Sequence, residues 1–127
     1  MLYKKGEGKI DTLIKVFKSI SDITRLRIIK ILQEKDELCV CEIVQALDIS
    51  QTRASRNLGI LKNAGFVVDR RDGLWIYYSI NKEMSNQYHM QINILIKDWL
   101  NNEKIVQKDK ERLKKTNKYT SKNLCNR

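Results

Sequence analysis

The feature that most constrains the fold is a pair of helical segments separated by a very short turn. The first covers residues 42–47 with apolar side chains on one face, and only two residues separate it from Ser50. Ser50 is a favourable N-cap, and apolar residues recur behind it at helical spacing: Ala54, Leu58 and Leu61. Gly65 suits the left-handed residue that closes a helix, so the sequence predicts a second helix over residues 51–64.

Beyond this pair the pattern changes from helical to β-type. Two runs rich in β-branched and aromatic residues, 66–70 and 74–80, flank Asp72-Gly73. Asp-Gly between such runs is a strong signal of a two-stranded hairpin. A short helix, a tight turn, a second helix and a ribbon predict a winged helix-turn-helix, mainly α with a β-hairpin wing. In that fold the second helix enters the major groove of duplex DNA and the ribbon touches the adjacent backbone.

Further helices are predicted on either side of this unit. One apolar face runs from Ile10 to near Ser21, and a run over residues 24–33 is apolar around much of its circumference, as expected for a helix at the centre of the core. In the last helix, apolar residues repeat at spacings of 4, 3 and 4: Tyr88, Ile92, Leu95 and Trp99. This spacing suits contact with a partner helix, so dimerisation is the expected use.

The net charge of +10 favours polyanions such as nucleic acid or an anionic membrane surface. Residues 101–127 hold nine basic and three acidic side chains, a net of +6, with few large apolar groups. We therefore predict an N-terminal extension over residues 1–9, a DNA-binding and dimerisation domain over 10–100, and a basic, flexible tail over 101–127. Bulk charge is then weak evidence about the folded surface.

Several classes of protein are disfavoured. No stretch approaches the ~20 apolar residues that cross a bilayer, and the N-terminus lacks the apolar core of a secretory signal, so we expect a cytoplasmic protein without a membrane partner. Three cysteines, Cys39, Cys41 and Cys125, are then expected to be reduced. No phosphate loop, Ser/His/Asp arrangement or pair of catalytic carboxylates stands out, which argues against an enzyme and an organic cofactor.

Hydrogen-bond donors crowd the exposed start of the helix over 51–64, and residues 50–63 contain no acid. Arginine suits guanine and glutamine suits adenine, although a lone basic helix is often just a solvated face. On the ribbon, two arginines alternate with two aspartates, so this segment could simply cover the core. The candidate DNA-contacting residues are Ser50, Gln51, Thr52, Arg53, Ser55, Arg56, Lys62, Arg70 and Arg71.

Three segments resemble the ArsR/SmtB family of metal-responsive repressors: SQTRASRNL at 50–58, AGFV at 64–67 and RDGLWIYY at 71–78. The likeness spans roughly residues 12–100 and implies a homodimer in which first and last helices pair, each subunit reading half of an imperfect palindrome. Asn57 stands where the family often has histidine, and Ile23 where it commonly has proline. The interface residues expected on this basis are Leu13, Phe17, Tyr88, Ile92, Leu95 and Trp99.

Cys39-Val40-Cys41, at the start of the first helix of the pair, looks like the family's most specific ligand motif. Residues two apart on an ideal helix lie about 200° apart, so both thiolates cannot close on one ion while that turn stays helical. Chelation should therefore distort the helix start and lower DNA affinity. Resemblance to the arsenic-sensing branch implies arsenite or antimonite as the inducer, with Cys39, Cys41 and Cys125 as candidate ligands.

The sequence leaves several candidates for the third ligand of the ion. The arsenic-sensing branch often has another cysteine where this chain has Val44, so Cys125, a small thiol or solvent could complete a pyramidal site. A coil of the length that precedes Cys125 spans roughly 25 to 30 Å, enough to reach such a site. Cadmium and lead are also thiophilic, whereas zinc is disfavoured because His89 is the single histidine. A redox-sensing repressor and a DNA-binding protein with inert cysteines are the alternative functions.

Overall fold

The computed structural model describes residues 9–83 and 87–116. The helices are α1 (Lys9–Ile20), α2 (Ile23–Leu32), α3 (Val40–Leu47), α4 (Gln51–Asn63), α5 (Gln87–Asp98) and α6 (Lys104–Lys115). The strands are β1 (Leu38–Cys39), β2 (Val67–Asp72) and β3 (Trp75–Ile80). This arrangement confirms the predicted fold, mainly α with a β-hairpin wing.

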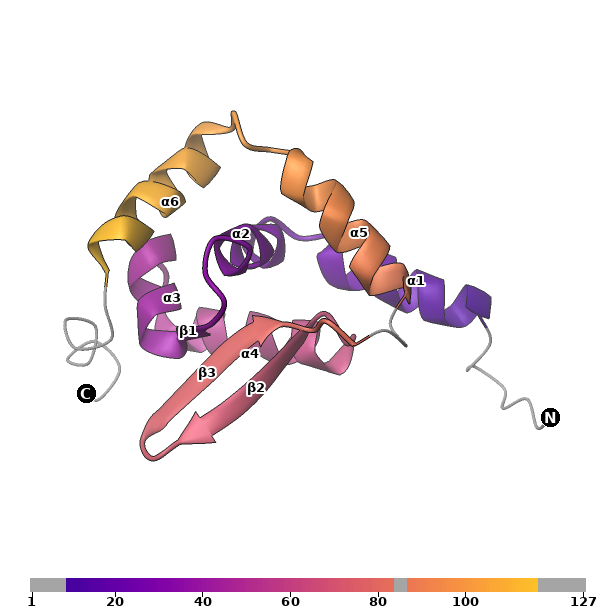
Figure 1. Ribbon diagram of the computed structural model, residues 1–127, viewed down its shortest axis with the longest axis horizontal. Coiled ribbons are helices and arrows are strands. Elements are labelled where there is room, and N and C mark those ends of the chain that lie inside the picture. The colour runs from indigo at the N-terminus through magenta and orange to yellow at the C-terminus, as the bar shows by residue number, and fades with distance from the viewer. Residues whose placement is uncertain (1–8, 84–86, 117–127) are drawn as a thin grey trace.

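Helix α2 lies at the centre of the molecule, with the other helices arranged around it (Figure 1). Its isoleucines at 28, 29 and 31 are fully buried, as the nearly uniform apolar pattern of this segment predicts. Asp22 begins the helix, since its side chain accepts a hydrogen bond from the Arg25 backbone N–H at 3.1 Å. Helices α5 and α6 lie above α2 as the two arms of an inverted V (Figure 1).

The sheet has three antiparallel strands in the order β1-β3-β2. The predicted hairpin is confirmed: Asp72 pairs with Trp75, and Gly73 takes the turn with a φ of 62°, which a side chain would strain. Strand β1 was not predicted. It pairs Leu38 with Tyr78 and Cys39 with Tyr77, and so ties the residue just before α3 to the wing.

The turn between α3 and α4 is as short as the sequence predicts. Asp48 ends α3 in the left-handed conformation, with a φ of 54°. Ser50 then begins α4, where its hydroxyl accepts from the Arg53 backbone N–H at 3.1 Å. Gly65 follows the end of α4 with a φ of 90°, and a side chain there would meet the His89 ring at 3.0 Å.

The prediction of a flexible tail over residues 101–127 is wrong for 104–115, which form α6. Val106 and Leu113, seven residues apart, are buried on one face of this helix, and α6 packs mainly against α3 and also against α2. The sequence reading weighed the charge of this segment and overlooked the helical spacing of its few apolar residues. Residues 117–127 lie outside the described part of the chain, and so do residues 1–8 of the predicted N-terminal extension.

Within residues 9–83 and 87–116, none of the helices combines the length and the apolar character that crossing a bilayer requires.

Candidate nucleic-acid interface and thiol site

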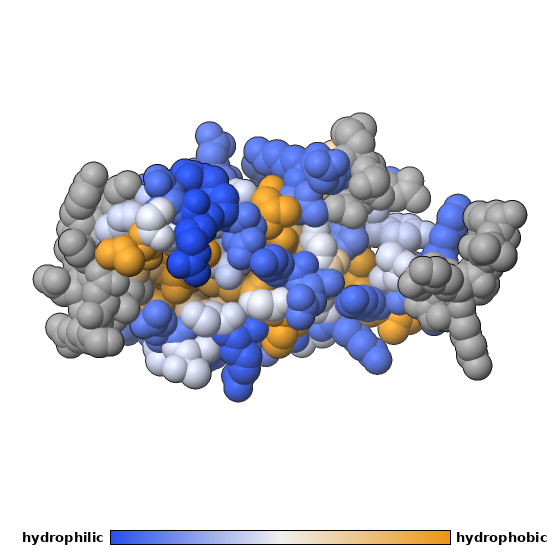
Figure 2. Space-filling model, turned by 90° about the horizontal axis from the view of Figure 1, so that it is seen from below, coloured by the Kyte–Doolittle hydropathy of each residue, from blue (hydrophilic) through white to orange (hydrophobic). Residues whose placement is uncertain are grey.

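The start of α4 presents a polar face to solvent. Ala54, Leu58 and Leu61 are fully buried and fix the orientation of this helix. The predicted contact residues of its first two turns all lie exposed on the opposite side: Gln51, Thr52, Arg53, Ser55 and Arg56. Figure 2 shows that the face on which α4 and the hairpin lie is mostly hydrophilic, with a few apolar side chains between the polar ones. The exposed hydrogen-bond donors on this face are of the kind that contact phosphates and base edges.

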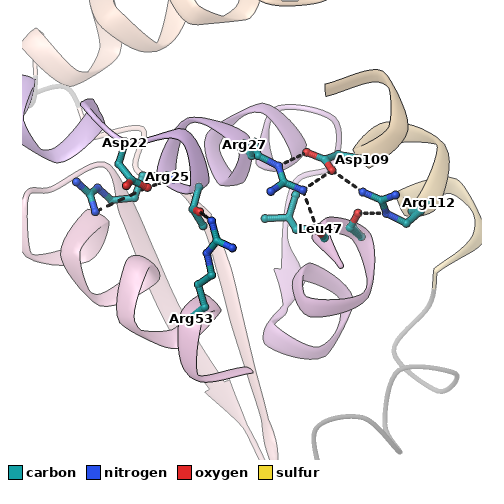
Figure 3. A network of polar contacts seen from close by, with 9 residues as sticks. Asp22, Arg25, Arg27, Leu47, Arg53, Asp109 and Arg112 are labelled. Atoms are coloured by element: carbon teal, nitrogen blue, oxygen red, sulfur yellow. Dashed lines mark hydrogen bonds and ion pairs between the residues drawn. The ribbon is translucent and has the colours of Figure 1, made fainter. Parts of the chain in front are cut away.

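A polar network binds the start of α4 to α2 (Figure 3). The Arg53 guanidinium donates to the Thr24 hydroxyl at 2.5 Å. Arg25 donates to the Asn57 side-chain oxygen at 2.9 Å, and the Asn57 amide donates to the Arg53 carbonyl at 2.9 Å. Asn57 is only 3% exposed, so this departure from the family pattern holds α4 against α2. Sequence reasoning missed the roles of Thr24 and Arg25, because the contacts join residues about thirty positions apart.

Two basic residues near the wing, Lys62 and Arg70, are paired with carboxylates. Lys62 forms an ion pair with Asp69 at 3.0 Å, and this hydrogen bond raises the pKa of Lys62. Arg70 makes two hydrogen bonds to the Glu37 carboxylate and lies over the Tyr77 ring, 4.4 Å from its centroid.

Two exposed arginines stand apart from these pairs. Within residues 9–83 and 87–116, neither Arg56 of α4 nor Arg71 of β2 forms an ion pair. These two guanidiniums are therefore the most available for phosphate or base contacts.

Cys39 and Cys41 lie around one small cavity. Cys39 is 1% exposed and Cys41 5% exposed. The cavity has a volume of about 180 Å³, and both cysteines line it. Its other walls come from α3, from the start of α4 and from the tip of the wing: Val40, Gln51, Ser55, Leu74, Trp75 and Ile76. Cys39 is a free thiol, whereas Cys41 is disulfide-bonded, so the expectation of reduced cysteines is wrong for Cys41 in this structure. Both sulfurs share the cavity with two of the predicted DNA-contacting residues.

The prediction that both cysteines belong to one helical turn is wrong for Cys39. Cys39 is the N-cap of α3, with an extended backbone (φ −77°, ψ 159°), because it also pairs with Tyr77 of β3. Only Cys41 lies within the helix. A ligand that draws the two sulfurs together would therefore act on the junction of β1 and α3 rather than on a continuous helical turn.

The surroundings of Cys39 favour the neutral thiol. Burial raises its pKa to about 11, and the negative charge of Glu42 adds to this, whereas the Glu42 backbone N–H opposes it. The Glu42 carboxylate accepts a hydrogen bond from the Cys39 backbone N–H at 3.0 Å, which closes the first turn of α3. At neutral pH the Cys39 side chain is therefore protonated.

The described residues supply no complete metal site. Among residues 9–83 and 87–116, no group of three or more His, Cys, Asp or Glu side chains could hold an ion. Cys125, the predicted third ligand, lies outside this part of the chain. His89 is buried in the core, where its Nε2 lies 2.5 Å from the Ala64 carbonyl oxygen and its ring packs edge-on against Phe66. Its surroundings are those of a structural histidine.

Helices α1 and α5 lie side by side (Figure 1). Both helices expose apolar residues. Of the predicted interface residues, Phe17, Leu95 and Trp99 are about half exposed. Leu13 is half-buried, and Tyr88 and Ile92 pack partly against the core. The prediction omitted other exposed apolar residues on the same helices: Ile10, Ile14 and Ile94. Apolar side chains gathered in this way are typical of an interface.

Comparison with known proteins gives consistent matches. A family model described as "Bacterial regulatory protein, arsR family" matches residues 22–68. The arsenic resistance transcriptional regulator ArsR2 of Pseudomonas putida is 41% identical over 88 residues, which cover 67% of this chain and 76% of that protein. A cadmium resistance regulatory protein, CadC homolog, of Staphylococcus aureus is 41% identical over 73 residues, 58% of this chain and 60% of that protein.

Among solved structures, the homodimeric winged helix-turn-helix DNA-binding domain Mb0332 of Mycobacterium bovis superposes with a TM-score of 0.62 at 28% identity. The match covers 79% of this chain and 92% of that domain. Together with the α3–α4 pair and the wing, these findings confirm the resemblance seen in the sequence and the prediction that the chain is not an enzyme. The chain belongs to the arsR family of bacterial regulatory proteins, which are winged helix-turn-helix DNA-binding transcriptional regulators.

Proposed function

We propose that this protein is a cytoplasmic repressor that binds operator DNA as a homodimer and releases it when trivalent arsenic or antimony binds Cys39 and Cys41. One observation carries the proposal: both cysteines line the cavity that also contacts Gln51 and Ser55 of the DNA-reading helix. A ligand in this cavity lies against the DNA-binding surface itself. Binding of an ion in this cavity and binding of DNA can therefore influence each other directly, without a long chain of intervening residues.

The chemistry of release follows from the junction of β1 and α3. Once a cellular thiol has reduced the disulfide of Cys41, a soft ion bound by both sulfurs would pull Cys39 out of its pairing with Tyr77 and away from the Glu42 contact. Either change moves the start of α3 or the base of the wing. An ion that binds only the altered state lowers DNA affinity by its differential binding energy, typically about 1–3 kcal/mol.

DNA contact is assigned to the exposed start of α4 and to the wing. The exposed guanidiniums of Arg56 and Arg71 support this assignment, together with the exposed side chains of Gln51, Thr52 and Ser55. Lys62 and Arg70 would have to exchange their carboxylate partners for phosphate. A homodimer formed through α1 and α5 would cover their exposed apolar residues and present two such faces to a palindromic site.

The inducing ion is the least constrained part of the proposal. Regulators of arsenic resistance and of cadmium resistance are both similar to this chain. Arsenite, antimonite, cadmium and lead all favour thiolate ligands. We favour arsenite or antimonite, with Cys125 or a small thiol as the third sulfur, because a pyramidal ion needs fewer ligands than a tetrahedral one.

The proposal is tested by fluorescence anisotropy of the reduced protein on duplex DNA from its own upstream region. Arsenite, antimonite, cadmium and zinc are titrated separately against the complex. We expect arsenite or antimonite to release the wild-type protein, and the Cys39→Ser/Cys41→Ser variant to bind the DNA equally well but stay bound. A Cys125→Ser variant shows whether the third cysteine contributes.

Two outcomes would change the assignment. Release by cadmium but not by arsenite or antimonite would retain the repressor and replace the inducer. Specific binding that no ion disturbs would leave a DNA-binding protein with inert cysteines, or, if an oxidant releases it, a redox sensor.

A further inference from the structure

A buried ionic network joins α6 to α2. Asp109 of α6 is 1% exposed, and its carboxylate accepts two hydrogen bonds from Arg27 of α2, each at 2.8 Å. It also accepts one from Arg112, one turn further along α6, at 2.8 Å. A carboxylate buried this deeply is held by charge-assisted hydrogen bonds on both oxygens. Figure 3 shows the two guanidiniums on either side of Asp109.

The same two arginines reach the end of α3. Arg27 donates to the Leu47 carbonyl oxygen at 2.8 Å, and Arg112 donates to the Ala46 carbonyl oxygen at 2.7 Å. Carbonyls in the last turn of a helix have no partner within the helix, and positive charge is favourable there. Arg27 and Arg112 therefore cap α3 from outside, and Asp109 holds both of them in place.

The end of α3 determines where α4 lies. Helix α3 has only eight residues, and the left-handed Asp48 turns the chain directly toward Ser50, the N-cap of α4. Because only two residues separate Leu47 from Ser50, a displacement of the end of α3 also displaces the start of α4. The other end of α3 carries Cys39 and Cys41, so α3 lies between the thiol cavity and the contacts from α6.

We infer that α6 is a clamp on the helix-turn-helix, in which Asp109 and Arg112 are positioning residues for DNA binding. By capping α3 they hold α4 in the orientation that reads DNA. A further consequence rests on the proposed function: the clamp opposes the shift of α3 that a thiol ligand requires, so it raises the ion concentration needed for release. By reciprocity, loosening the clamp weakens DNA binding and eases ion binding.

The decisive variant is Arg112→Ala, with Lys108→Ala as its matched control. Both remove one positive charge from α6, but Lys108 is exposed, whereas Arg112 contacts Asp109 and Ala46. In Arg112→Ala, Asp109 keeps both hydrogen bonds from Arg27. We expect operator affinity to fall about tenfold below that of Lys108→Ala, and affinity for unrelated duplex DNA to change equally in both variants.

Circular dichroism melting of each variant checks that the fold is retained, and Arg112→Lys provides a second, milder change. Because lysine keeps one donor near Asp109, we expect it to recover part of the operator affinity. Equal operator affinities for Arg112→Ala and Lys108→Ala would overturn the inference. So would a loss of the same size on unrelated DNA, since that result would show only a loss of charge.

The DNA-binding measurements above are made without arsenite, antimonite or cadmium. They therefore test the role of α6 in DNA binding even if the proposed ion response is wrong. The second arm titrates cadmium and antimonite against the DNA complexes of the same variants. We expect half-release of Arg112→Ala at a several-fold lower concentration than for Lys108→Ala. If the wild type releases DNA but the two variants need the same concentration, the clamp has no part in ion sensing.

Discussion

Helices α4 and α6 flank α3 and are both rich in basic residues, but they use their charge differently. Helix α4 has three basic residues and no acid, and its Arg56 is exposed without an ion pair among the described residues. Helix α6 carries more charge, yet its Asp109 is buried and its Arg112 caps another helix. The comparison teaches that a count of basic residues does not locate a DNA-binding face. The partners of each cation decide whether it can reach phosphate.

The largest expected effect is a loss of stability on substitution of Asp109, the buried carboxylate of α6. Asp109→Ala leaves Arg27 at the centre of the molecule without a carboxylate, and the loss of one partner of a buried pair costs about 3–5 kcal/mol. Urea unfolding followed by circular dichroism measures this loss. Glu111→Ala, an exposed change on the same helix, is the control and should leave the free energy of unfolding nearly unchanged. Equal stability of the two variants would contradict the assigned role of Asp109.

Charge on α4 should affect DNA binding instead of stability. Arg56→Ala is expected to reduce operator affinity by about 1–3 kcal/mol if Arg56 has its proposed role of contacting a base edge or a phosphate. The same substitution should leave the melting temperature within about a degree or two of wild type, since Arg56 is exposed. Anisotropy and thermal melting on one preparation separate the two effects. A stability loss without an affinity loss would reverse the comparison between α4 and α6.

An intermediate effect is expected at the N-cap of α4. Ser50→Ala removes the acceptor for the Arg53 backbone N–H and should cost about 1 kcal/mol of stability. Ser50→Asp supplies another acceptor and should preserve stability, while its negative charge weakens binding to phosphate. Denaturation and anisotropy of the two variants therefore distinguish capping from DNA contact. If both variants are as stable as wild type, the cap contributes little.

The smallest effect is expected at the ion pair between α4 and the wing. Asp69→Asn removes the partner of Lys62, and because this ion pair is open to solvent, stability should change little. The freed Lys62 should strengthen DNA binding by several-fold and steepen its dependence on salt concentration. Anisotropy at several salt concentrations tests this. A Lys62→Ala/Asp69→Asn double variant that gains as much affinity would show that Lys62 is not responsible.

Much of the fold could be predicted from the sequence because its signals are local. The cap at Ser50, the turn at Gly73 and the helical spacing of apolar residues each depend on a few neighbouring positions. Strand β1 could not be predicted, because two residues give no periodicity and its pairing with Tyr77 and Tyr78 is long-range. Helix α6 had a readable apolar spacing, but its charge obscured that signal.

The candidate site was predictable in its residue types but not in its contacts. The sequence indicates that donors gather at the start of α4, whereas it cannot reveal that Arg53 binds Thr24 or that Arg70 binds Glu37. The cysteine pair was singled out by its spacing and by resemblance. Its cavity, by contrast, depends on how the wing folds back over α3. Long-range hydrogen bonds and the closing of cavities are properties of the packed molecule.

The protonated state of Cys39 makes the proton a competitor for a divalent cation such as cadmium or lead, but not for arsenite. With a pKa of about 11, this sulfur must surrender its proton whenever it binds a soft ion. For cadmium or lead, each unit rise in pH below that pKa should strengthen binding about tenfold through this group alone. Arsenite is As(OH)3 at neutral pH, so the thiol proton leaves with a hydroxide as water, and its binding should depend little on pH. The pH dependence of DNA release therefore distinguishes the two kinds of inducer: the concentration needed for release should fall with rising pH for cadmium and stay nearly constant for arsenite.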